Sequence, residues 1–390
     1  MYIERFLQTA LDRYLDIFPV TAVTGPRQSG KTTLLRHHLT DTYEYITFDD
    51  PQNVNFFYSD PEGFFNRYKD KIIFDEVQKV PEIFQYLKMT VDNERLNYGR
   101  YIITGSSQFS LVNSITESLA GRVGLLTLLP FQYLEIPESE RAEQILFGSY
   151  PELIIRKYKH HTEWYGSYFS TYIERDVRSL YKIGNLRDFG RLVYILAAQC
   201  TQELNMSRLA REIGVTVKTI QAWISVLEAS YIIFLLPPYH KNLGKRIVKR
   251  PKLYFYDTGL ICYLTGVETS LHLNRGPLAG PVFENYIVSE IKKAGLHGMK
   301  KDTLYYFRNN TGIEADLIIE NLADQRLIFM EIKNNETHKY KMTDNIRTLI
   351  SLETSSLNKS GILLYRGKEN GAYSEHVSYM NALSYLEEIS

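Results

Sequence analysis

A loop near the start of the chain has the residue types that bind phosphate groups. It follows the β-branched run Val20–Thr24 and consists of Gly25, Pro26, Arg27, Gln28, Ser29, Gly30, Lys31, Thr32 and Thr33. An apolar helix start comes next, so this is the GxxxxGK[ST] pattern in a strand–loop–helix context. Loop N–H groups would surround the phosphates, Lys31 would reach the β- and γ-phosphates, and Thr32 would coordinate Mg²⁺. The pattern predicts a Mg-ATP site, against the alternative of a chance glycine-rich turn.

Two carboxylates at the end of a second apolar strand predict hydrolysis of that nucleotide. The run Lys71–Phe74 ends in Asp75 and Glu76, about forty residues after the loop. The first acid can hold the metal, and the second can polarise an attacking water. Two acids at a solvated strand end are the alternative interpretation. We expect Asp75 to be a Mg²⁺ ligand and Glu76 to be the catalytic base.

Hydroxyl groups and two arginines are further candidates for the same site. Thr104, Ser106 and Ser107 end a third apolar strand, whose carboxyl end should face the ligand crevice. One of them could sense the γ-phosphate, or they could form a plain turn. Arg122, before the last strand, could be a catalytic arginine finger in cis or from a neighbouring subunit, or a surface residue. Arg27, inside the loop itself, has the same two interpretations, a catalytic residue or a surface residue.

Charged residues far along the chain fit metal-dependent phosphodiester cleavage. Glu314 and Asp316 alternate in one strand pattern, Glu331 and Lys333 in the next, and Glu284 lies in a helical segment. Alternate strand residues share a face, so Asp316, Glu331 and Lys333 could converge as catalytic residues. Glu284, Asp316 and Glu331 would bind Mg²⁺, and Lys333 would orient water or stabilise charge. Ordinary solvated strand faces are the alternative.

The elements that must position these residues suggest three domains in an α/β protein. Residues 1–155 alternate short β-rich runs with helical stretches, which predicts a P-loop NTPase domain with a parallel sheet. Residues 156–271 are helical and include a helix–turn–helix pattern. Residues 272–390 combine a helix with strand patterns, which suggests a second α/β unit. Its charged residues Asp316, Glu331 and Lys333 make it resemble a restriction-endonuclease-like domain. The apolar runs of the first domain are Val20–Thr24, Tyr45–Phe48, Lys71–Asp75, Tyr101–Thr104 and Leu125–Leu129.

The middle segment has the outline of a winged helix. Apolar residues between Ser207 and Glu228 fit two short crossed helices with Gly214 at the turn. Strand patterns at Tyr231–Leu236 and Lys252–Tyr256 flank a basic loop. DNA contact is the functional interpretation, and packing against the nucleotide domain or protein binding is the alternative. The basic residues of the loop are Lys241, Lys245, Arg246, Lys249 and Arg250.

Composition excludes a global electrostatic attraction to nucleic acid or membrane, because 45 basic residues balance 45 acidic ones. The two cysteines, Cys200 and Cys262, build neither a disulfide framework nor a thiolate metal site. The charged N-terminal segment lacks a signal-peptide core, and no apolar run approaches the roughly 20 residues that span a bilayer. We therefore expect a cytoplasmic protein without a membrane partner.

Several longer motifs occur along the chain: GPRQSGKTTLL, IIFDEVQ, ITGSSQ, LAGR followed by LLPF, LFGSYPEL, YIERDV, PKLYFYDTGL and FENYIVSEI. Together they resemble a prokaryotic family of AAA-related ATPases that carry a C-terminal domain of unknown function. This resemblance spans nearly the whole chain and implies Mg-ATP binding, with Asp75 and Glu76 as Walker B acids. The C-terminal acids resemble those of PD-(D/E)xK nucleases, notably the Holliday-junction-resolvase-like branch, with Ala315 in place of the usual proline.

These patterns lead to one expected function and one alternative from another class. We expect a Mg²⁺-dependent ATPase that acts on DNA through a winged helix and a nuclease-like domain. The alternative is a nucleotide-driven regulatory switch that acts through protein contacts, with an inactive nuclease-like scaffold. A small-molecule kinase would leave the middle and C-terminal patterns unexplained. If Arg122 acts in trans, a homo-oligomer is required.

Overall fold

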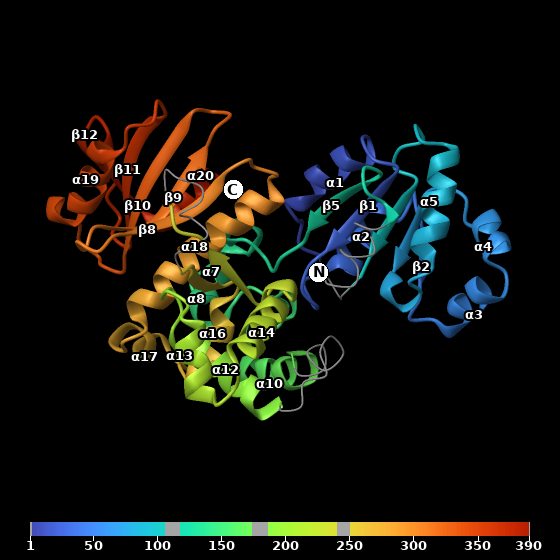
Figure 1. Cartoon of the computed structure of the whole chain (residues 1–390), viewed down its shortest axis with the longest axis horizontal. Helices are drawn as coiled ribbons and strands as arrows, with labels where there is room; N and C mark the ends of the chain where they lie inside the picture. The colour runs from blue at the N-terminus through green and yellow to red at the C-terminus, as the bar shows by residue number, and fades with distance from the viewer. Residues whose placement is uncertain (1, 106–117, 174–185, 240–249, 390) are drawn as a thin grey trace.

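The chain forms an N-terminal sheet region (α1 to β5), a middle helical region (α9 to α17) and a C-terminal sheet region (α18 to α20) (Figure 1). The computed structural model describes residues 2–105, 118–173, 186–239 and 250–389. The two sheet regions lie at opposite ends of the long axis (Figure 1). Helix α18 (Ala279–His297) packs against elements of all three regions, including β5, α16 and β10.

The N-terminal sheet is parallel throughout, in the order β2-β3-β4-β1-β5. Its central strands are apolar on both faces, as a sheet covered on both sides requires. The strands predicted at Val20–Thr24 and Tyr101–Thr104 are confirmed with the same bounds, whereas the last strand begins two residues earlier than predicted. The strands are β1 (Val20–Thr24), β2 (Glu44–Thr47), β3 (Ile72–Asp75), β4 (Tyr101–Thr104) and β5 (Val123–Thr127).

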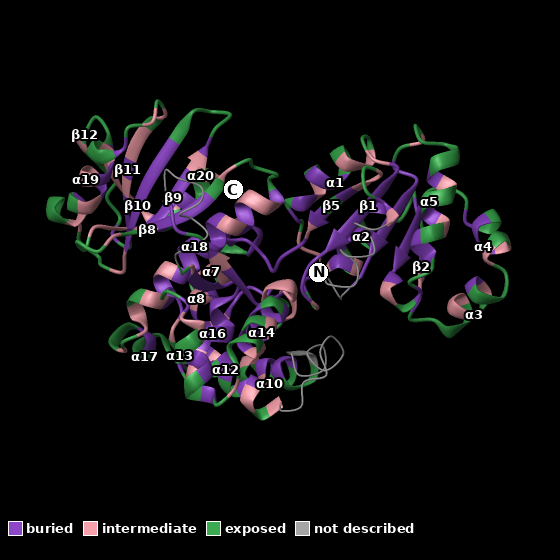
Figure 2. Cartoon of the chain, viewed as in Figure 1, coloured by how far each residue is buried: buried purple, intermediate pink, exposed green. Residues whose placement is uncertain are grey.

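Helices cover both faces of this sheet. Apolar residues of α1 and α2 pack on one face, and those of α3, α4 and α5 pack on the other. Figure 2 shows the strands buried between them, with exposed residues on the outward sides of the helices. The helices are α1 (Leu7–Leu15), α2 (Lys31–Leu39), α3 (Pro51–Ser59), α4 (Pro61–Arg67) and α5 (Ile83–Asn93), with the short η1 (Val77–Lys79) after β3.

The middle region contains two capped helices, α13 (Met206–Ile213) and α14 (Val217–Ala229), at the segment where the apolar pattern predicts a helix–turn–helix. Asn205 caps the first helix, Gly214 ends it with φ 86°, and Thr216 caps the second. A positive φ at the turn favours glycine. The neighbouring helices are α9 (Pro151–Ile155), α10 (His161–Ser167), η3 (Tyr168–Ile173), α12 (Leu186–Ala198), α16 (Thr258–Thr265) and α17 (Ser270–Arg275).

An antiparallel strand pair follows α14. Strand β6 (Ile233–Leu236) pairs with β7 (Lys252–Phe255), so that Leu236 lies opposite Lys252. Of the basic residues predicted between these strands, Arg250 is exposed. The other four (Lys241, Lys245, Arg246 and Lys249) lie outside the described residues.

The C-terminal sheet is mixed, in the order β12-β13-β11-β10-β9-β8. Strands β8, β9 and β10 form an antiparallel meander, and β11 runs parallel to β10. Helices α18 and α20 cover one face and α19 covers the other. The elements are β8 (Thr303–Arg308), β9 (Glu314–Asn321), β10 (Arg326–Lys333), η4 (Tyr340–Thr343), α19 (Asp344–Leu352), β11 (Asn358–Tyr365), β12 (Gly371–Ser374), β13 (Val377–Asn381) and α20 (Ala382–Ile389).

The connection from the N-terminal sheet to the middle region packs against α18. It contains three short helices, η2 (Tyr133–Glu135), α7 (Glu138–Arg141) and α8 (Gln144–Phe147). Within the described parts of the chain, no helix combines the length and the apolar character that a membrane span requires.

Candidate nucleotide site and carboxylate cluster

The loop between β1 and α2 has a backbone that glycine makes possible. Gly25 has φ 140°, and a Cβ there would lie 2.0 Å from the main-chain oxygen of Leu128. Gly30 has φ 94° and caps α2. Both positions therefore exclude a side chain, the first by close approach of another strand end and the second by its conformation. The loop N–H groups and the start of α2 can face an anion.

Lys31 is buried and folds back on its own loop. Its Nζ donates to the carbonyl oxygens of Gly25 (2.9 Å) and Pro26 (2.8 Å). Burial lowers the pKa of Lys31 to about 8. The negative charges of Glu76 and Asp75 oppose this shift, because they favour the charged form of the lysine. Among the described residues, the partners of this ammonium group at hydrogen-bond distance are thus neutral main-chain oxygens, which phosphate oxygens can replace.

Hydroxyl and carboxylate oxygens meet where β1 and β3 end. Thr32 Oγ1 donates to Asp75 Oδ2 at 3.0 Å, and the Tyr45 hydroxyl donates to the same oxygen. The Glu76 N–H donates to Asp75 Oδ1 at 3.0 Å, and the Gln78 amide donates to the Glu76 carboxylate. Glu76 itself has φ 57°. This set of oxygen donors fits Mg²⁺, which prefers carboxylate and hydroxyl ligands.

Two buried hydroxyl groups near the loop have no hydrogen-bond partner in the described part of the chain. They are Thr104 Oγ1, at the end of β4, and Ser29 Oγ in the loop. A buried polar group without a partner costs about 1–3 kcal/mol. A bound phosphate would satisfy groups of this kind, so the residues present fit a nucleotide. Ser106 and Ser107 lie outside the described residues.

A cavity of about 740 Å³ lies over the loop and has walls from two regions. One wall contains loop residues and Glu76. The other comes from α9, α10 and the residues around them, where Trp164 stacks on Tyr168 with ring centroids 5.1 Å apart. Sequence analysis missed this second wall: Glu152 lies in the motif LFGSYPEL, but nothing in that motif indicates a nucleotide, and the other residues were not singled out as a site. Its residues are Glu152, Arg156, His160, Glu163, Trp164, Ser167, Tyr168 and Thr171.

In its own chain, Arg122 lies at the amino end of the strands, opposite to the end where the loop lies. It precedes β5, which runs parallel to β1, and its main-chain oxygen accepts from the N–H of Val20. Its guanidinium group binds both carboxylate oxygens of Asp92, at 2.6 and 3.0 Å. The structure therefore does not bring Arg122 to the loop in cis. Action in trans stays a prediction. Arg27 lines the cavity.

The C-terminal charged residues converge at one end of the antiparallel meander. Asp316 Oδ2 accepts the N–H of Ile332 at 2.8 Å, which fixes this carboxylate beside β10. Lys333 Nζ lies 2.5 Å from Glu331 Oε1, and the other carboxylate oxygen of Glu331 is buried without a partner in the described residues. Helix α18 brings Glu284 to the same place. The strand alternation thus predicted the grouping of these side chains.

An ammonium group from the middle region lies among these carboxylates. Lys252, the first residue of β7, has its Nζ 2.9 Å from Glu314, 3.3 Å from Glu284 and 3.7 Å from Asp316. The Tyr254 hydroxyl, on the same strand, donates to Glu284 at 2.7 Å. Sequence analysis named Lys252 only as the start of a strand. Its partners are 32 to 64 residues away, so no local pattern points to it.

Burial and mutual repulsion dominate the electrostatics of this cluster. Burial, followed by the charge of Asp316, raises the pKa of Glu284 and of Glu331 to about 7. Burial alone would lower the pKa of Lys252. The carboxylates around it outweigh this effect and raise the pKa above its ordinary value. Among the described residues, no group of three or more His, Cys, Asp or Glu side chains is arranged to hold a metal ion. The carboxylates instead surround an ammonium group.

Arg5 connects the phosphate-binding loop to the segment that follows β5. Its guanidinium group donates to the main-chain oxygens of Ser29 (2.8 Å) and Leu129 (2.6 Å) and to Glu135 Oε1 (3.0 Å). Both Arg5 and Glu135 are buried. Through these hydrogen bonds, one side chain joins the loop backbone to the connection.

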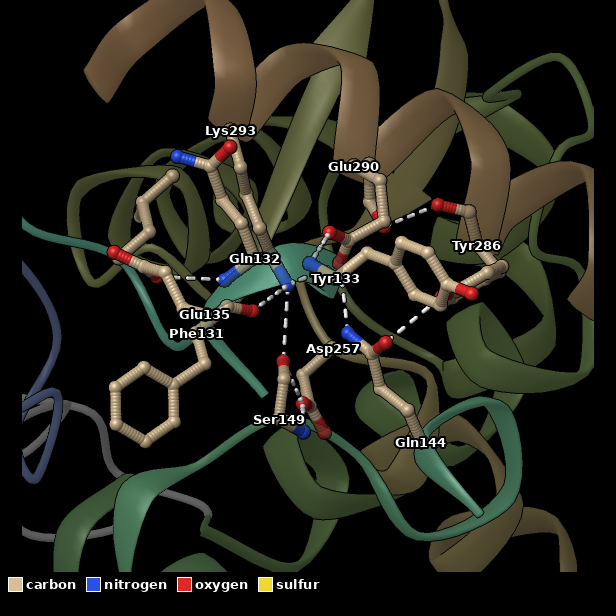
Figure 3. A network of polar contacts seen from close by, with 12 residues as sticks. Phe131, Gln132, Tyr133, Glu135, Gln144, Ser149, Asp257, Tyr286, Glu290 and Lys293 are labelled. Carbon is tan, nitrogen blue, oxygen red and sulfur yellow. Dashed lines mark hydrogen bonds and ion pairs between the residues drawn. The ribbon is translucent and has the colours of Figure 1, made fainter. Parts of the chain in front are cut away.

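The same connection is hydrogen-bonded to α18 (Figure 3). Glu290 accepts the N–H of Tyr133 at 2.7 Å, and Lys293 donates to Ser149 Oγ at 2.9 Å. At the end of the helix, His297 Nε2 accepts the N–H of Leu129 at 3.0 Å. Helix α18 also carries Glu284, so one helix contacts both the segment that follows β5 and the carboxylate cluster.

Three family models match consecutive stretches of the chain. A family model described as an AAA domain matches residues 18–137. Two models described as domains of unknown function, DUF8612 and DUF4143, match residues 138–271 and 279–385.

Among solved structures, the walker-type ATPase paby2304 of Pyrococcus abyssi has a TM-score of 0.48 at 15% identity, over 68% of this chain and 96% of that one. The RuvB Holliday junction branch migration motor of Thermotoga maritima has a TM-score of 0.30 at 13% identity, over 63% and 95%.

Two relatives are similar over most of the chain. They are the uncharacterized proteins Mb2031c of Mycobacterium bovis and Rv2008c of Mycobacterium tuberculosis. Each is 32% identical over 340 residues, which is 86% of this chain and 75% of the relative. The chain therefore belongs to the same family as these two mycobacterial proteins, and its N-terminal region is an AAA-type, nucleotide-dependent ATPase domain.

Proposed function

We propose that this chain is a Mg²⁺-dependent ATPase whose nucleotide state controls how its middle region engages DNA. The observation that carries the proposal is the cavity over the phosphate-binding loop, because the middle region supplies its second wall. A nucleotide bound there would contact both regions at once. Its binding and loss would therefore change the free energy of their association.

The residues of the loop supply the chemistry of hydrolysis. Lys31 exchanges its two main-chain partners for phosphate oxygens and stabilises charge as the terminal phosphate leaves. Thr32 and Asp75 would hold Mg²⁺, which neutralises phosphate charge when bound. Glu76, oriented by Gln78, accepts the proton of the attacking water. Thr104 would donate to the terminal phosphate, which gives its buried hydroxyl a partner.

A direct contact supports coupling to the helix–turn–helix. Helix α14 ends at Ala229, and the hydroxyl of Tyr231 lies 2.9 Å from Thr24 Oγ1 and 3.1 Å from Thr127 Oγ1. Thr24 is the residue before the first glycine of the loop. A shift of the loop would therefore displace Tyr231, which follows the end of α14 by two residues.

DNA is the partner that the middle region fits best. The exposed face of α14 carries Lys218, Gln221 and Ser225, which are side chains that can contact base edges or phosphates. The arrangement of α13, α14, β6 and β7 supports the winged-helix interpretation, in which α14 enters a groove. The basic sequence between β6 and β7 would then bind phosphates.

Tryptophan fluorescence tests the cavity. The chain has two tryptophans, so Trp223→Phe leaves Trp164 as the only one. Mg-ATP should change the emission of Trp164 in this variant, and adding Lys31→Ala should abolish the change. Bound ATP, measured with a radiolabelled nucleotide, without any change in Trp164 emission would contradict a site that includes the middle region.

Anisotropy of labelled linear and branched DNA tests the partner. Affinity should fall with rising salt, and Lys218→Ala with Gln221→Ala should weaken binding. Lys359→Ala, in the C-terminal sheet, is the matched control. Binding that neither salt nor these substitutions change would exclude the proposed DNA surface. ATPase activity measured with and without each DNA then shows whether DNA alters turnover.

A second candidate function is a regulatory switch that acts through protein contacts. The observation that favours it is Lys252, which neutralises the nuclease-like carboxylates. Under the DNA-directed proposal, Asp316, Glu331 and Lys333 cut or grip the DNA backbone. A plasmid-nicking assay with Mg²⁺ or Mn²⁺ separates the two: nicking that Lys333→Ala abolishes supports cleavage, and the absence of nicking in the parent supports the switch.

A further inference from the structure

A third cavity, of about 320 Å³, lies where three parts of the chain meet. The connection supplies residues of α7 and α8, and the middle region supplies residues of α17. The C-terminal region supplies α18, the segments that follow β10 and β11, and the start of α20. None of the lining residues belongs to the nucleotide site or to the carboxylate cluster. Cavities of this size at such junctions are common places for small ligands.

One part of the cavity lining is apolar. Leu273 of α17 and Phe283 of α18 are buried there, next to the ring of Tyr286. The Tyr286 hydroxyl donates to the amide oxygen of Gln144 at 2.8 Å, which holds the ring in place (Figure 3). Leu383, at the start of α20, also lines the cavity and is 38% exposed. The cavity is therefore accessible from solvent and offers apolar side chains to a ligand.

Two arginines line the same cavity, and among the described residues both have neutral hydrogen-bond partners. Arg141 donates to two main-chain oxygens of the connection, at 2.9 and 3.4 Å. Arg366 donates to the amide oxygens of Asn274 and Asn334, at 3.0 and 3.3 Å. A guanidinium group has five N–H donors, so each arginine keeps donors for a further partner. Neither charge is balanced by a carboxylate within ion-pair distance in the described part of the chain.

The cavity as a whole favours negative charge. Its described lining contains no aspartate or glutamate, whereas the cavity over the phosphate-binding loop includes Glu76, Glu152 and Glu163. Helix α18 begins at this cavity with Ala279, and no side chain caps its first turn, so its amino end adds positive potential. A cavity with charges of one sign concentrates ions of the opposite sign.

We propose that this cavity binds a small amphiphilic acid. Its carboxylate accepts hydrogen bonds from Arg141 and Arg366, and its apolar body packs on Leu273, Phe283 and Leu383. Guanidinium and carboxylate groups match in geometry and form strong, charge-assisted hydrogen bonds. The volume of about 320 Å³ equals that of about ten water molecules, which suits an acid of about ten non-hydrogen atoms. Such a ligand contacts three parts of the chain at once, so its binding stabilises their association.

Calorimetric titration of the nucleotide-free full chain with octanoate tests this inference. No nucleotide is present, so the result is independent of the ATPase proposal. We expect one octanoate to bind per chain and to raise the melting temperature. Acetate lacks the apolar body and 1-octanol lacks the charge, so each should bind at least about tenfold more weakly.

Arg366→Gln tests the charge, because this side chain is exposed and its loss should leave the fold intact. The variant should bind octanoate at least about tenfold more weakly than the parent. Lys368→Gln is the matched control: it removes one positive charge from an exposed position two residues further on, outside the cavity lining, and should bind octanoate as the parent does. Leu383→Asp adds a carboxylate to the lining at an exposed position and should abolish binding.

Three results would overturn the inference. The first is a parent chain for which octanoate gives neither heat nor a change in melting temperature. The second is equal binding of octanoate and 1-octanol, because the arginines would then not recognise the ligand. The third is binding that neither Arg366→Gln nor Leu383→Asp weakens, because the acid would then lie elsewhere.

Discussion

Two buried lysines, Lys31 and Lys252, lie among oxygen atoms, but their partners differ in charge and in distance along the chain. Lys31 binds two neutral carbonyl oxygens five and six residues before it. Lys252 binds three carboxylates on elements of another region. The pKa of Lys31 is lowered by burial, whereas that of Lys252 is raised by its neighbours. The first ammonium group is therefore ready to accept an anion, and the second is already paired.

The largest effect that this comparison predicts is on ATP hydrolysis by Lys31→Ala. Losing a positioned positive charge at a transferring phosphate should lower kcat by about 10²–10³. The fold should be little affected, because the lysine has only carbonyl partners. Lys71→Ala is the control: its ammonium group also donates to a carbonyl oxygen, that of Gly99 at 3.1 Å, but it lies at the amino end of β3, away from the loop at the carboxyl end of β1. A variant at Lys31 with more than a tenth of the parent's rate would contradict the assigned role.

Lys252→Met should instead change stability. Removing one partner from a buried ion pair leaves the other charges uncompensated and costs about 3–5 kcal/mol. Urea unfolding followed by circular dichroism should show this loss in the free energy of unfolding. Glu314→Gln in the same chain should recover part of it, because the net charge of the cluster is restored. A cost equal to that of Lys359→Met, which removes a lysine of β11 that donates to main-chain oxygens, would mean that Lys252 is not bound as its contacts indicate.

The difference between these lysines also explains how much the sequence predicts. The phosphate-binding loop is contiguous, so its residue types, its strand and its helix appear together in one short pattern. Strand alternation likewise brought Asp316, Glu331 and Lys333 to one face, because β9 and β10 are neighbours joined by a tight turn. Periodicity within a strand thus predicts a grouping when the strands are adjacent.

What the sequence does not predict is docking between regions. The sequence predicts only that Lys252 begins a strand. The packing of β7 against α18 is what places its side chain among carboxylates. Trp164 and Arg156 line the nucleotide cavity for the same reason. The early start of β5 at Val123 reflects its register with Val20 of β1, a pairing between residues about a hundred positions apart. Such contacts leave no local periodicity.

His297 lies between the two sites and should make stability depend on pH. Burial lowers its pKa to about 3. The charge of Glu135 raises the pKa, and the charges of Arg5 and Lys293 lower it. The folded chain therefore binds this proton less readily than the unfolded chain, whose histidine has a pKa near 6.5. The contribution is present above pH 6.5 and is lost as pH falls toward 3, by at most about 1.4 kcal/mol per pH unit.

His297→Gln isolates this contribution. Unfolding free energies measured in urea at pH 6.5, 5.5 and 4.5 should fall less steeply for the variant than for the parent. Glu284 and Glu331, whose raised pKa values give the opposite slope, are present in both chains and cancel in the difference. Parallel profiles would show that the pKa of His297 is not lowered in the folded chain.

The smallest predicted effect is at Thr216, a contact that belongs to neither lysine. Its side chain accepts the N–H of Thr219 at 3.1 Å and caps α14. Thr216→Ala should cost about 1 kcal/mol of unfolding free energy, because one helix N–H loses its partner, and Thr216→Ser should cost little. A cap acts within four residues, so the loss should add to that of Lys252→Met without coupling. A coupling larger than about 0.5 kcal/mol would mean that α14 and β7 move together, and that Lys252 holds the whole helix–turn–helix.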